Sequence, residues 1–307
     1  MTTPEIVVVG SYNQDVSLRV ARLPAPGETC LSLGRLESPG GKGSNQAIQA
    51  ARAGAATAMV AAIGLDGGGD TALALWEKDG IDTSAVVRLA DAGTGLAMIL
   101  VDAAAENVIV VDSGANMRLA PAHIDAAAGT IGAAKLVLAQ LETPAAATIR
   151  AFQIGRSAGA TTVLNAAPAP ESIDVELLAL TDILVVNEGE GQALSGQSDP
   201  AEIGESLIQR VGRAVVVTLG ADGAVLFERG QPPHAARSPM VLVVDTTGAG
   251  DAFTGAFAAR LVVTGDARAA LAWGLAAGAL ACTAPGASQS CADASRIAEL
   301  AETLAVG

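Results

Sequence analysis

Short, continuously apolar runs separated by alanine-rich stretches of helical length constrain the fold of this chain more than any other feature. The runs are rich in Val, Ile and Leu and do not alternate with polar residues, which is typical of strands buried on both faces. Such strands, separated by helices, predict an α/β fold with a doubly wound, mostly parallel sheet and helices on both faces. The runs are Ile6–Val9, Ala58–Ile63, Leu136–Leu138, Thr161–Leu164, Ile183–Val186, Ala214–Leu219 and Ala224–Phe227.

Two segments, about 14–39 and 93–113, break this pattern. Both mix polar with apolar residues and contain turn signals, such as Pro24-Ala25-Pro26-Gly27 and Asp102–Glu106. The pattern is typical of antiparallel strands with one solvated face. A small antiparallel β sheet inserted into a doubly wound domain is the expected form of a lid over a site. We therefore expect one α/β domain over residues 1–307, with these two lid segments inserted in it.

The overall charge and the aromatic content exclude some classes of partner. The formal net charge is −14 and aromatic residues make up 2% of the chain. A polyanion would be repelled and would find few stacking platforms, so we expect no nucleic-acid partner. No signal peptide is visible, and the longest apolar stretch, roughly Ala269 to Ala284, is shorter than the ~20 residues of a membrane span. Cysteines without C-x-x-C spacing agree with a reducing compartment, so we expect a cytoplasmic protein without membrane contact.

The segment from Asp245 to Phe253 is the most informative for chemistry. It reads DTTGAGDAF, and an apolar helical stretch follows it. Glycines at a helix start let backbone N–H groups converge on an anion, and Asp251 would lie beside that anion site as a proton acceptor. A run of β-like residues, Met240–Val244, precedes it. The alternative interpretation is a glycine-rich turn whose acidic residue favours a helix N-terminus.

Three further segments carry polar groups at element ends. Gly40–Gln46 reads GGKGSNQ; it is not a P-loop, but its Lys and Asn could hold hydroxyl groups at a helix start, or it is a plain entry loop. Gly10–Asp15 follows the first strand, where a polyol could bind, or where an Asx-turn leaves the strand. Asn187–Glu190 predicts a helix-capping box, and the same Glu190 could approach Mg²⁺ through water.

Together these segments resemble the ribokinase-like carbohydrate kinase family along nearly the whole chain. Gly40–Asn45 resembles the first family signature and Asp245–Asp251 the second. Between them the family's other motifs follow in order and approximate spacing: Thr94-Gly95, Gln140–Glu142, Asn165–Ala169, Asn187–Glu190 and Thr218–Gly223.

The resemblance implies transfer of the γ-phosphoryl group of ATP to the 5-hydroxyl of D-ribose, with Asp251 as catalytic base. Sugar contacts are implied for Asn13, Asp15, Gly41, Lys42, Asn45, Glu142 and Asp251. An anion hole is implied for Gly248, Ala249 and Gly250, and ATP contacts for Asn187, Thr218, Leu219, Gly220, Ala221, Asp222, Gly223 and Gly250. Glu190 is implied near Mg²⁺ through water, and an activating K⁺ near Asp245, Thr247, Ala281, Ala284, Gly286 and Ser290. The family also implies a homodimer formed through the lid.

The resemblance leaves the substrate more open than the reaction. Leu275 aligns where the family commonly has His or Asn near the adenine, which leaves the nucleotide preference open. Other members of the family act on other sugars, such as deoxyribose or fructose, or on nucleosides. The lid segments have no aromatic residue apart from Tyr12 at their edge, which argues against a nucleoside. A non-catalytic sugar- or nucleotide-binding protein of the same fold is the alternative from another class.

Overall fold

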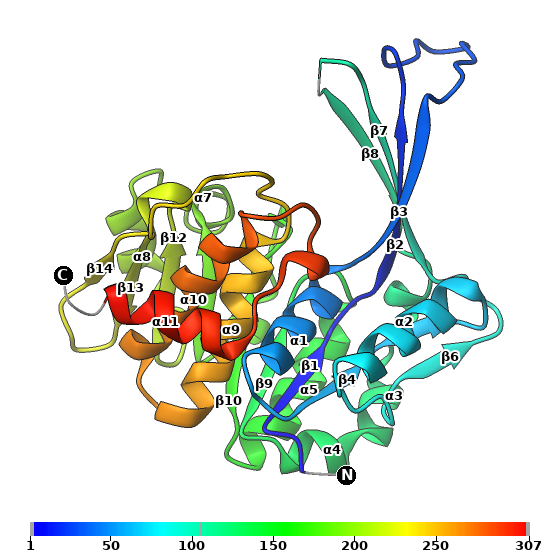
Figure 1. The fold of residues 1–307 in the computed structure, drawn as a ribbon. Helices are drawn as coiled ribbons and strands as arrows, with labels where there is room; N and C mark the ends of the chain where they lie inside the picture. The colour runs from blue at the N-terminus through cyan, green and yellow to red at the C-terminus, as the bar shows by residue number, and fades with distance from the viewer. Residues whose placement is uncertain (1–2, 105, 305–307) are drawn as a thin grey trace.

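The computed structural model describes residues 3–104 and 106–304, and an eight-stranded sheet forms its centre (Figure 1). Six of its strands, β12, β11, β10, β9, β1 and β4, are mutually parallel, and β13 and β14 add an antiparallel edge. The order is β14 (His234–Ala236), β13 (Ala224–Glu228), β12 (Ala214–Thr218), β11 (Ile183–Asn187), β10 (Thr161–Asn165), β9 (Leu136–Ala139), β1 (Ile6–Val9) and β4 (Thr57–Val60). The predicted mostly parallel sheet is confirmed. The run Ala58–Ile63 divides, because β5 (Ala62–Gly64) leaves the sheet to pair with β6 (Val87–Leu89).

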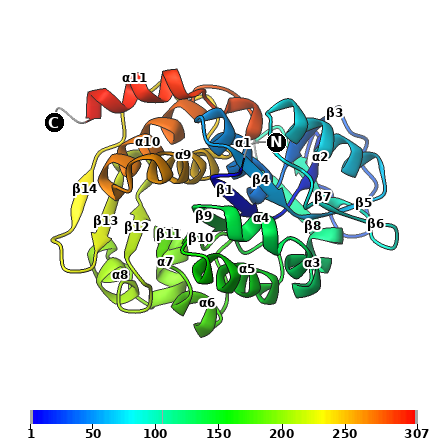
Figure 2. The ribbon, with the colours of Figure 1, turned by 90° about the horizontal axis from the view of Figure 1, so that it is seen from below.

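Helices cover both faces of the sheet, which explains why its strands are continuously apolar (Figure 2). In β1, Ile6 and Val8 face one core, whereas Val7 and Val9 face the other. The first core is covered by α1 (Lys42–Arg52), α2 (Gly67–Lys78), α9 (Ala249–Thr264), α10 (Ala267–Ala281) and α11 (Ala294–Leu304). The opposite face carries α3 (Pro121–Ala126), α4 (Ala128–Ala133), α5 (Ala145–Ser157), α6 (Val175–Ala179), α7 (Glu188–Ser195) and α8 (Pro200–Leu207).

The lid is a separate four-stranded sheet that projects away from the α/β body (Figure 1). It consists of β3 (Gly34–Gly40), β2 (Asn13–Arg19), β7 (Gly95–Val101) and β8 (Asn107–Asp112), in that order. The pairs β2–β3 and β7–β8 are antiparallel, as expected for the two segments. The central pair β2–β7 is parallel, since both strands leave the body in the same direction. The lid is thus two hairpins joined side by side.

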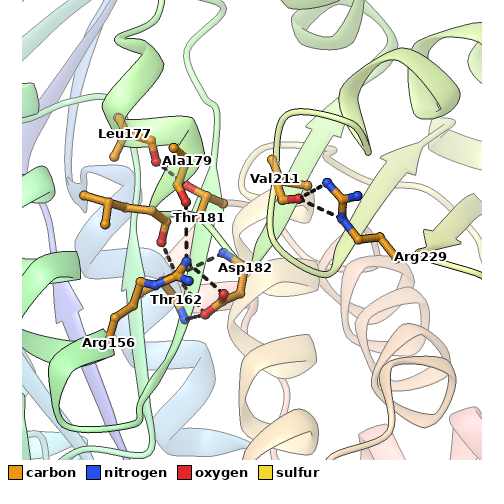
Figure 3. A network of polar contacts seen from close by, with 9 residues as sticks. Arg156, Thr162, Leu177, Ala179, Thr181, Asp182, Val211 and Arg229 are labelled. Atoms are coloured by element: carbon orange, nitrogen blue, oxygen red, sulfur yellow. Dashed lines mark hydrogen bonds and ion pairs between the residues drawn. The ribbon is translucent and has the colours of Figure 1, made fainter.

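The amino ends of the central strands are closed by a polar network (Figure 3). The Asp182 carboxylate accepts hydrogen bonds from the backbone N–H of Thr162 (2.9 Å) and from its hydroxyl (3.1 Å), and it pairs with Arg156 at 3.0 Å. The Thr162 hydroxyl also donates to the Leu180 carbonyl at 2.6 Å. These contacts tie α5, β10 and β11 together at this end of the sheet.

The segment Met240–Val244 is not a strand, which corrects the β-like interpretation of this run. The segment pairs with no strand and follows the edge strand β14 as irregular chain. Its Met240 and Leu242 side chains are exposed. No helix among the described residues is long and apolar enough to cross a membrane.

Candidate active site

The candidate catalytic residues gather at the carboxyl ends of the parallel strands. The chain reverses its winding between β1 and β9, which are neighbours in the sheet, and crevices at such switch points bind ligands in open α/β sheets. Helices α1 and α9, which carry the two glycine-rich segments, begin at this edge and pack against each other.

The first glycine-rich segment brings the start of α1 directly against the end of β1. Gly41 has φ +87°, and a Cβ on Gly43 would lie 2.4 Å from the Ser11 nitrogen, so a side chain is excluded at both positions. Gly41 has no side chain to cap the helix. The Glu142 carboxylate caps it instead, because its Oε2 accepts from the Lys42 N–H at 2.8 Å and from the Ser11 hydroxyl. Glu142 therefore holds the loop that carries Lys42.

Asp251, in the first turn of α9, is the most deeply buried carboxylate near the predicted sugar contacts. It is 8% exposed. Asn45 Nδ2 donates to its Oδ2 and Gln46 Nε2 to its Oδ1, both at 2.9 Å. Burial raises the pKa of Asp251 above its usual value, while Lys42 and the two amides oppose this shift. A buried carboxylate with fixed donors and a raised pKa is suited to accept a proton.

Asp15 and Asn13 lie at the base of the lid, beside the start of α1. Burial, with the nearby Glu142 charge, raises the pKa of Asp15 to about 6. A Cβ on Gly40 would lie 2.3 Å from the Asp15 carboxylate, so this glycine makes room for it. Asn13 is buried and its Oδ1 accepts from Asn116 Nδ2 at 2.9 Å. Both polar side chains therefore lie near Glu142 and the start of α1, which carries Lys42.

Two adjoining cavities open beside Asp251, one polar and one apolar. The polar cavity has a volume of 220 Å³ and the apolar one 400 Å³, and Thr218 and Gly250 line both. The polar cavity is lined by Lys42, Asn165, Asn187, Glu190, Gly248 and Asp251, among others. The apolar one is lined by Met240, Val241, Val243, Phe253, Leu275 and Ala279, among others. A polar chamber next to an apolar slot suits the phosphates and the base of a nucleotide.

The start of α9 faces the polar cavity with backbone donors. Gly248 has φ +75° and precedes the helix. The Ala249 N–H donates to the Thr246 carbonyl at 3.2 Å, so this amide closes a turn and is not a free donor of the anion hole. The N–H groups of Gly248 and Gly250 have no acceptor among the described residues. An ideal Cβ on Gly250 would also meet no atom within 4 Å, which leaves room for an anion beside the helix start.

The predicted capping box at the start of α7 is confirmed. Asn187 Oδ1 accepts from the Glu190 N–H at 2.8 Å, and Glu190 Oε2 accepts from the Asn187 N–H at 2.9 Å. Both residues also line the polar cavity. Burial raises the pKa of Glu190, and the nearby charges of Lys42 and Asp251 lower and raise it respectively. The cap thus fixes a carboxylate at the wall of the polar cavity.

Comparison with known proteins identifies the family. The family model of the pfkB carbohydrate kinases matches residues 3–294. The chain belongs to the pfkB family of carbohydrate kinases. It is 41% identical to a ribokinase of Staphylococcus aureus over 84% of this chain and 86% of the relative, and 39% identical to mouse ribokinase over 82% and 80%. The structure of Arabidopsis thaliana ribokinase complexed with ribose and ATP has a TM-score of 0.92 at 32% identity, covering 98% of this chain and 99% of the other.

Within this kinase fold, the second glycine-rich segment is held by the loop after α10. The Asp245 carboxylate accepts from the Gly286 N–H and from the Thr247 N–H, both at 2.9 Å. These hydrogen bonds lower the pKa of Asp245. The Val244 N–H donates to the Cys282 carbonyl at 2.8 Å. The two loops that the resemblance assigns to K⁺ are therefore joined by hydrogen bonds. Two of the residues assigned to K⁺ have other roles in the structure: Ala281 is the last residue of α10, and the Ser290 hydroxyl donates to the Ala287 carbonyl.

The structure brings most predicted site residues together, with two exceptions among the ATP contacts. Thr218, Gly220, Ala221 and Gly223 line the apolar cavity, whereas Leu219 and Asp222 do not line it. Asn187 lines the polar cavity instead.

Sequence reasoning missed the apolar wall formed by Ser238–Val241 and Val243. It quoted Gln46, Gln140 and Asn165 within motifs but gave their buried amides no role.

Proposed function

We propose that the protein transfers the γ-phosphoryl group of ATP to the 5-hydroxyl group of D-ribose. One observation carries this proposal: a buried carboxylate, Asp251, lies at a helix start that faces a polar cavity, with an apolar slot beyond it. Such an arrangement would bring a proton acceptor next to a phosphate site, and a base site next to that phosphate site. The ribokinases among its relatives support ribose as the acceptor.

The sugar end of the site would be built from short polar side chains. Asn45 Oδ1 is buried without a hydrogen-bond partner among the described residues, so it is an acceptor that a sugar hydroxyl can satisfy. Asn13, Asp15 and Glu142 supply further acceptors suited to a compact polyol. Because a site that hydrogen-bonds each hydroxyl rejects analogues lacking one, ribose should be preferred to 2-deoxyribose.

The nucleotide end would take the base into the apolar slot beside Leu275 and the phosphates into the polar cavity beside Lys42. No group of three or more His, Cys, Asp or Glu suited to a metal occurs in the part of the chain that the structure describes. A site with one carboxylate nearby, Glu190, fits Mg²⁺, which keeps several waters and binds mainly through substrate phosphates. When bound, Mg²⁺ would neutralise phosphate charge.

The chemical step would use Asp251 and the start of α9. The 5-hydroxyl of ribose donates its proton to the Asp251 carboxylate as its oxygen attacks the γ-phosphorus. The bond from that phosphorus to the bridging oxygen breaks, and ADP leaves. The N–H groups of Gly248 and Gly250, with the Lys42 ammonium, stabilise the charge on the transferring group.

We also propose that K⁺ activates the enzyme by fixing the second glycine-rich segment. The backbone carbonyls of Asp245, Thr247, Ala284 and Gly286 accept no hydrogen bond from the described residues, so they are available as oxygen ligands. Oxygen-only ligation suits a hard cation. The Asp245 carboxylate joins these two loops by its hydrogen bonds to Thr247 and Gly286. An ion between the loops would therefore fix the position of the Gly248 and Gly250 N–H groups.

The lid supports a proposal of homodimer formation. Its edge strand β8 exposes Val108 to Val111 by 45% or more, and Leu36 of β3 is 67% exposed. An apolar edge strand of this kind is normally covered. We propose that the lid of a second copy covers this edge strand.

We also propose that residues 1–307 act as one kinase domain. The protein would work in the cytoplasm, where ATP is available.

The test is ADP release by the purified protein with ATP and a panel of acceptors. We expect ribose to have the highest kcat/KM, with 2-deoxyribose and fructose lower. A preference for adenosine or fructose 6-phosphate would overturn the ribose assignment and leave the family intact. Ribose binding without ADP release would favour the non-catalytic alternative.

A further inference from the structure

The amide of Gln46 lies behind the candidate base and contacts neither cavity. Gln46 follows Asn45 in α1 and is completely buried. Its Nε2 donates to Asp251 Oδ1 and to Asn165 Oδ1, both at 2.9 Å. Its Oε1 accepts from Gln140 Nε2 at 2.6 Å. Both hydrogens and the oxygen of this amide are therefore engaged.

The neighbours of Gln46 fix which way its amide points. Asn165 Nδ2 donates to the Val185 carbonyl at 3.2 Å, which turns Asn165 Oδ1 toward Gln46. Gln140, directly after β9, presents its own Nε2 from the other side. A flipped Gln46 would set its oxygen against the oxygens of Asp251 and Asn165, and its nitrogen against that of Gln140. In a buried site such unpaired contacts are costly, so the donor is held on Asp251.

We propose that Gln46 is the positioning residue of the catalytic carboxylate: with Gln140 and Asn165 it aims Asp251 at the sugar hydroxyl and holds it in its proton-accepting form. This inference rests on the proposed role of Asp251. Gln46 itself lines neither the polar nor the apolar cavity, so it acts on the site through Asp251 and Asn165, which both line the polar one. Asn45 holds the other carboxylate oxygen, so the two neighbours in α1 together fix its plane.

Several charged groups face Asp251, and the amide acts against that background. Lys42 favours the ionised carboxylate, whereas Glu142 and Glu190 disfavour it. The Cys291 thiol, in the loop before α11, has its pKa raised to about 12 by burial and stays neutral. The hydrogen bond from Gln46 lowers the pKa of Asp251 against the effect of burial. Without it the pKa rises, so the base is protonated at a higher pH.

The test compares the variant Gln46→Met with Gln49→Met. Gln49 lies on the same helix and is equally buried, but its Nε2 donates to the Ala292 carbonyl and not to Asp251. In Gln46→Met we expect kcat with ribose to fall about 10–100-fold at pH 7.5, the range for a hydrogen bond to a charged group. The ribose KM should stay within about threefold.

The pH profile separates positioning from a purely structural role. The acid limb of kcat should move to higher pH in Gln46→Met, so that its deficit grows as the pH falls from 8.5 to 6. In Gln49→Met the limb should stay where the parent has it. An unmoved limb in Gln46→Met, an equal shift in Gln49→Met, or a loss confined to KM would overturn the proposal.

Two further measurements keep the proposal testable on their own. If Gln46→Met does not fold, Gln140→Met removes the lock on the Gln46 oxygen and should move the limb in the same direction by less; an unmoved limb there counts against the proposal. The ¹³C carboxyl titration of Asp251, assigned by its loss in Asp251→Asn, needs no substrate. It should show a higher pKa in Gln46→Met even if ribose is not the acceptor, so it distinguishes failure of this inference from failure of the proposed function.

Discussion

Replacing Asp251 with Asn should remove activity and, at neutral pH, stabilise the fold. The amide keeps the shape of the side chain but cannot accept the proton of the sugar hydroxyl. A positioned general base contributes about 10²–10⁴ in rate, which is roughly 3–5 kcal/mol of transition-state stabilisation. Ribose KM should change far less, because Asn13, Asp15 and Glu142 remain.

The stability effect follows from the buried charge. Burial raises the pKa of Asp251 above its unfolded value. A carboxyl group with a raised folded pKa contributes stability below its unfolded pKa, and this stability is lost as the pH rises through the folded pKa. At pH 8 the ionised group therefore opposes folding, and the uncharged amide does not. The Asn side chain can still accept from Gln46 and, after a turn of the Asn45 amide, donate to Asn45 Oδ1.

The assay is a melting curve without ligands from pH 4.5 to 8.5, together with kcat for ribose. We expect a higher Tm for Asp251→Asn at pH 8, about 1.5 °C for each kcal/mol gained in a chain of this length, and a difference that shrinks as the pH falls. Asp125→Asn, which breaks only an exposed pair with Arg150, is the control and should change neither quantity. Near-normal turnover would refute Asp251 as the base, and a lower Tm at pH 8 would refute the buried-charge argument.

Four other perturbations test separate parts of the site. Gly250→Ala should fold normally but lower turnover about 100-fold, because its methyl group enters the space beside the helix start; Gly129→Ala in α4, equally free of clashes, should stay active. Ribose KM should rise as the pH falls below about 6, where Asp15 takes up a proton, and a KM that is flat from pH 5 to 8 would contradict this. Turnover at constant ionic strength should rise when K⁺ replaces tetramethylammonium, and less with Na⁺; a flat response would reject the cation site. Val110→Glu, on the exposed edge strand, should convert a dimer to a monomer in analytical ultracentrifugation, and a parent that is already monomeric would exclude the lid dimer.

The sheet could be predicted because burial on both faces leaves a direct trace in the sequence. The runs Ile6–Val9 and Ile183–Val186 are continuously apolar and form strands with a parallel neighbour on both sides. Met240–Val244 is as apolar but pairs with no strand, and its Met240 and Leu242 side chains are exposed. An apolar run records that a segment is poorly hydrated, and not whether a neighbouring strand is available. The parallel β2–β7 pair of the lid was not predicted either, because the residues of a strand do not show which other strand lies beside it.

The site was predicted in its residues and not in its contacts. Asn45 and Asp251 are 206 residues apart, and their hydrogen bond follows from the packing of α1 against α9, which no local pattern encodes. The amides of Gln46, Gln140 and Asn165 lie in quoted motifs but received no role, because the role of a buried amide shows in its partners. The cap at Asn187 was predicted because it depends on residues three positions apart in one helix.

The central claim is most directly tested by ³¹P NMR of the purified protein mixed with ATP, Mg²⁺, K⁺ and D-ribose. We expect the γ-phosphate signal of ATP to disappear while the signals of ADP and of a phosphomonoester grow in equal amounts. Coupling of the new phosphorus signal to the C5 protons of the sugar would identify ribose 5-phosphate. Inorganic phosphate in place of the ester, a phosphate on another hydroxyl, or unchanged ATP would contradict the account.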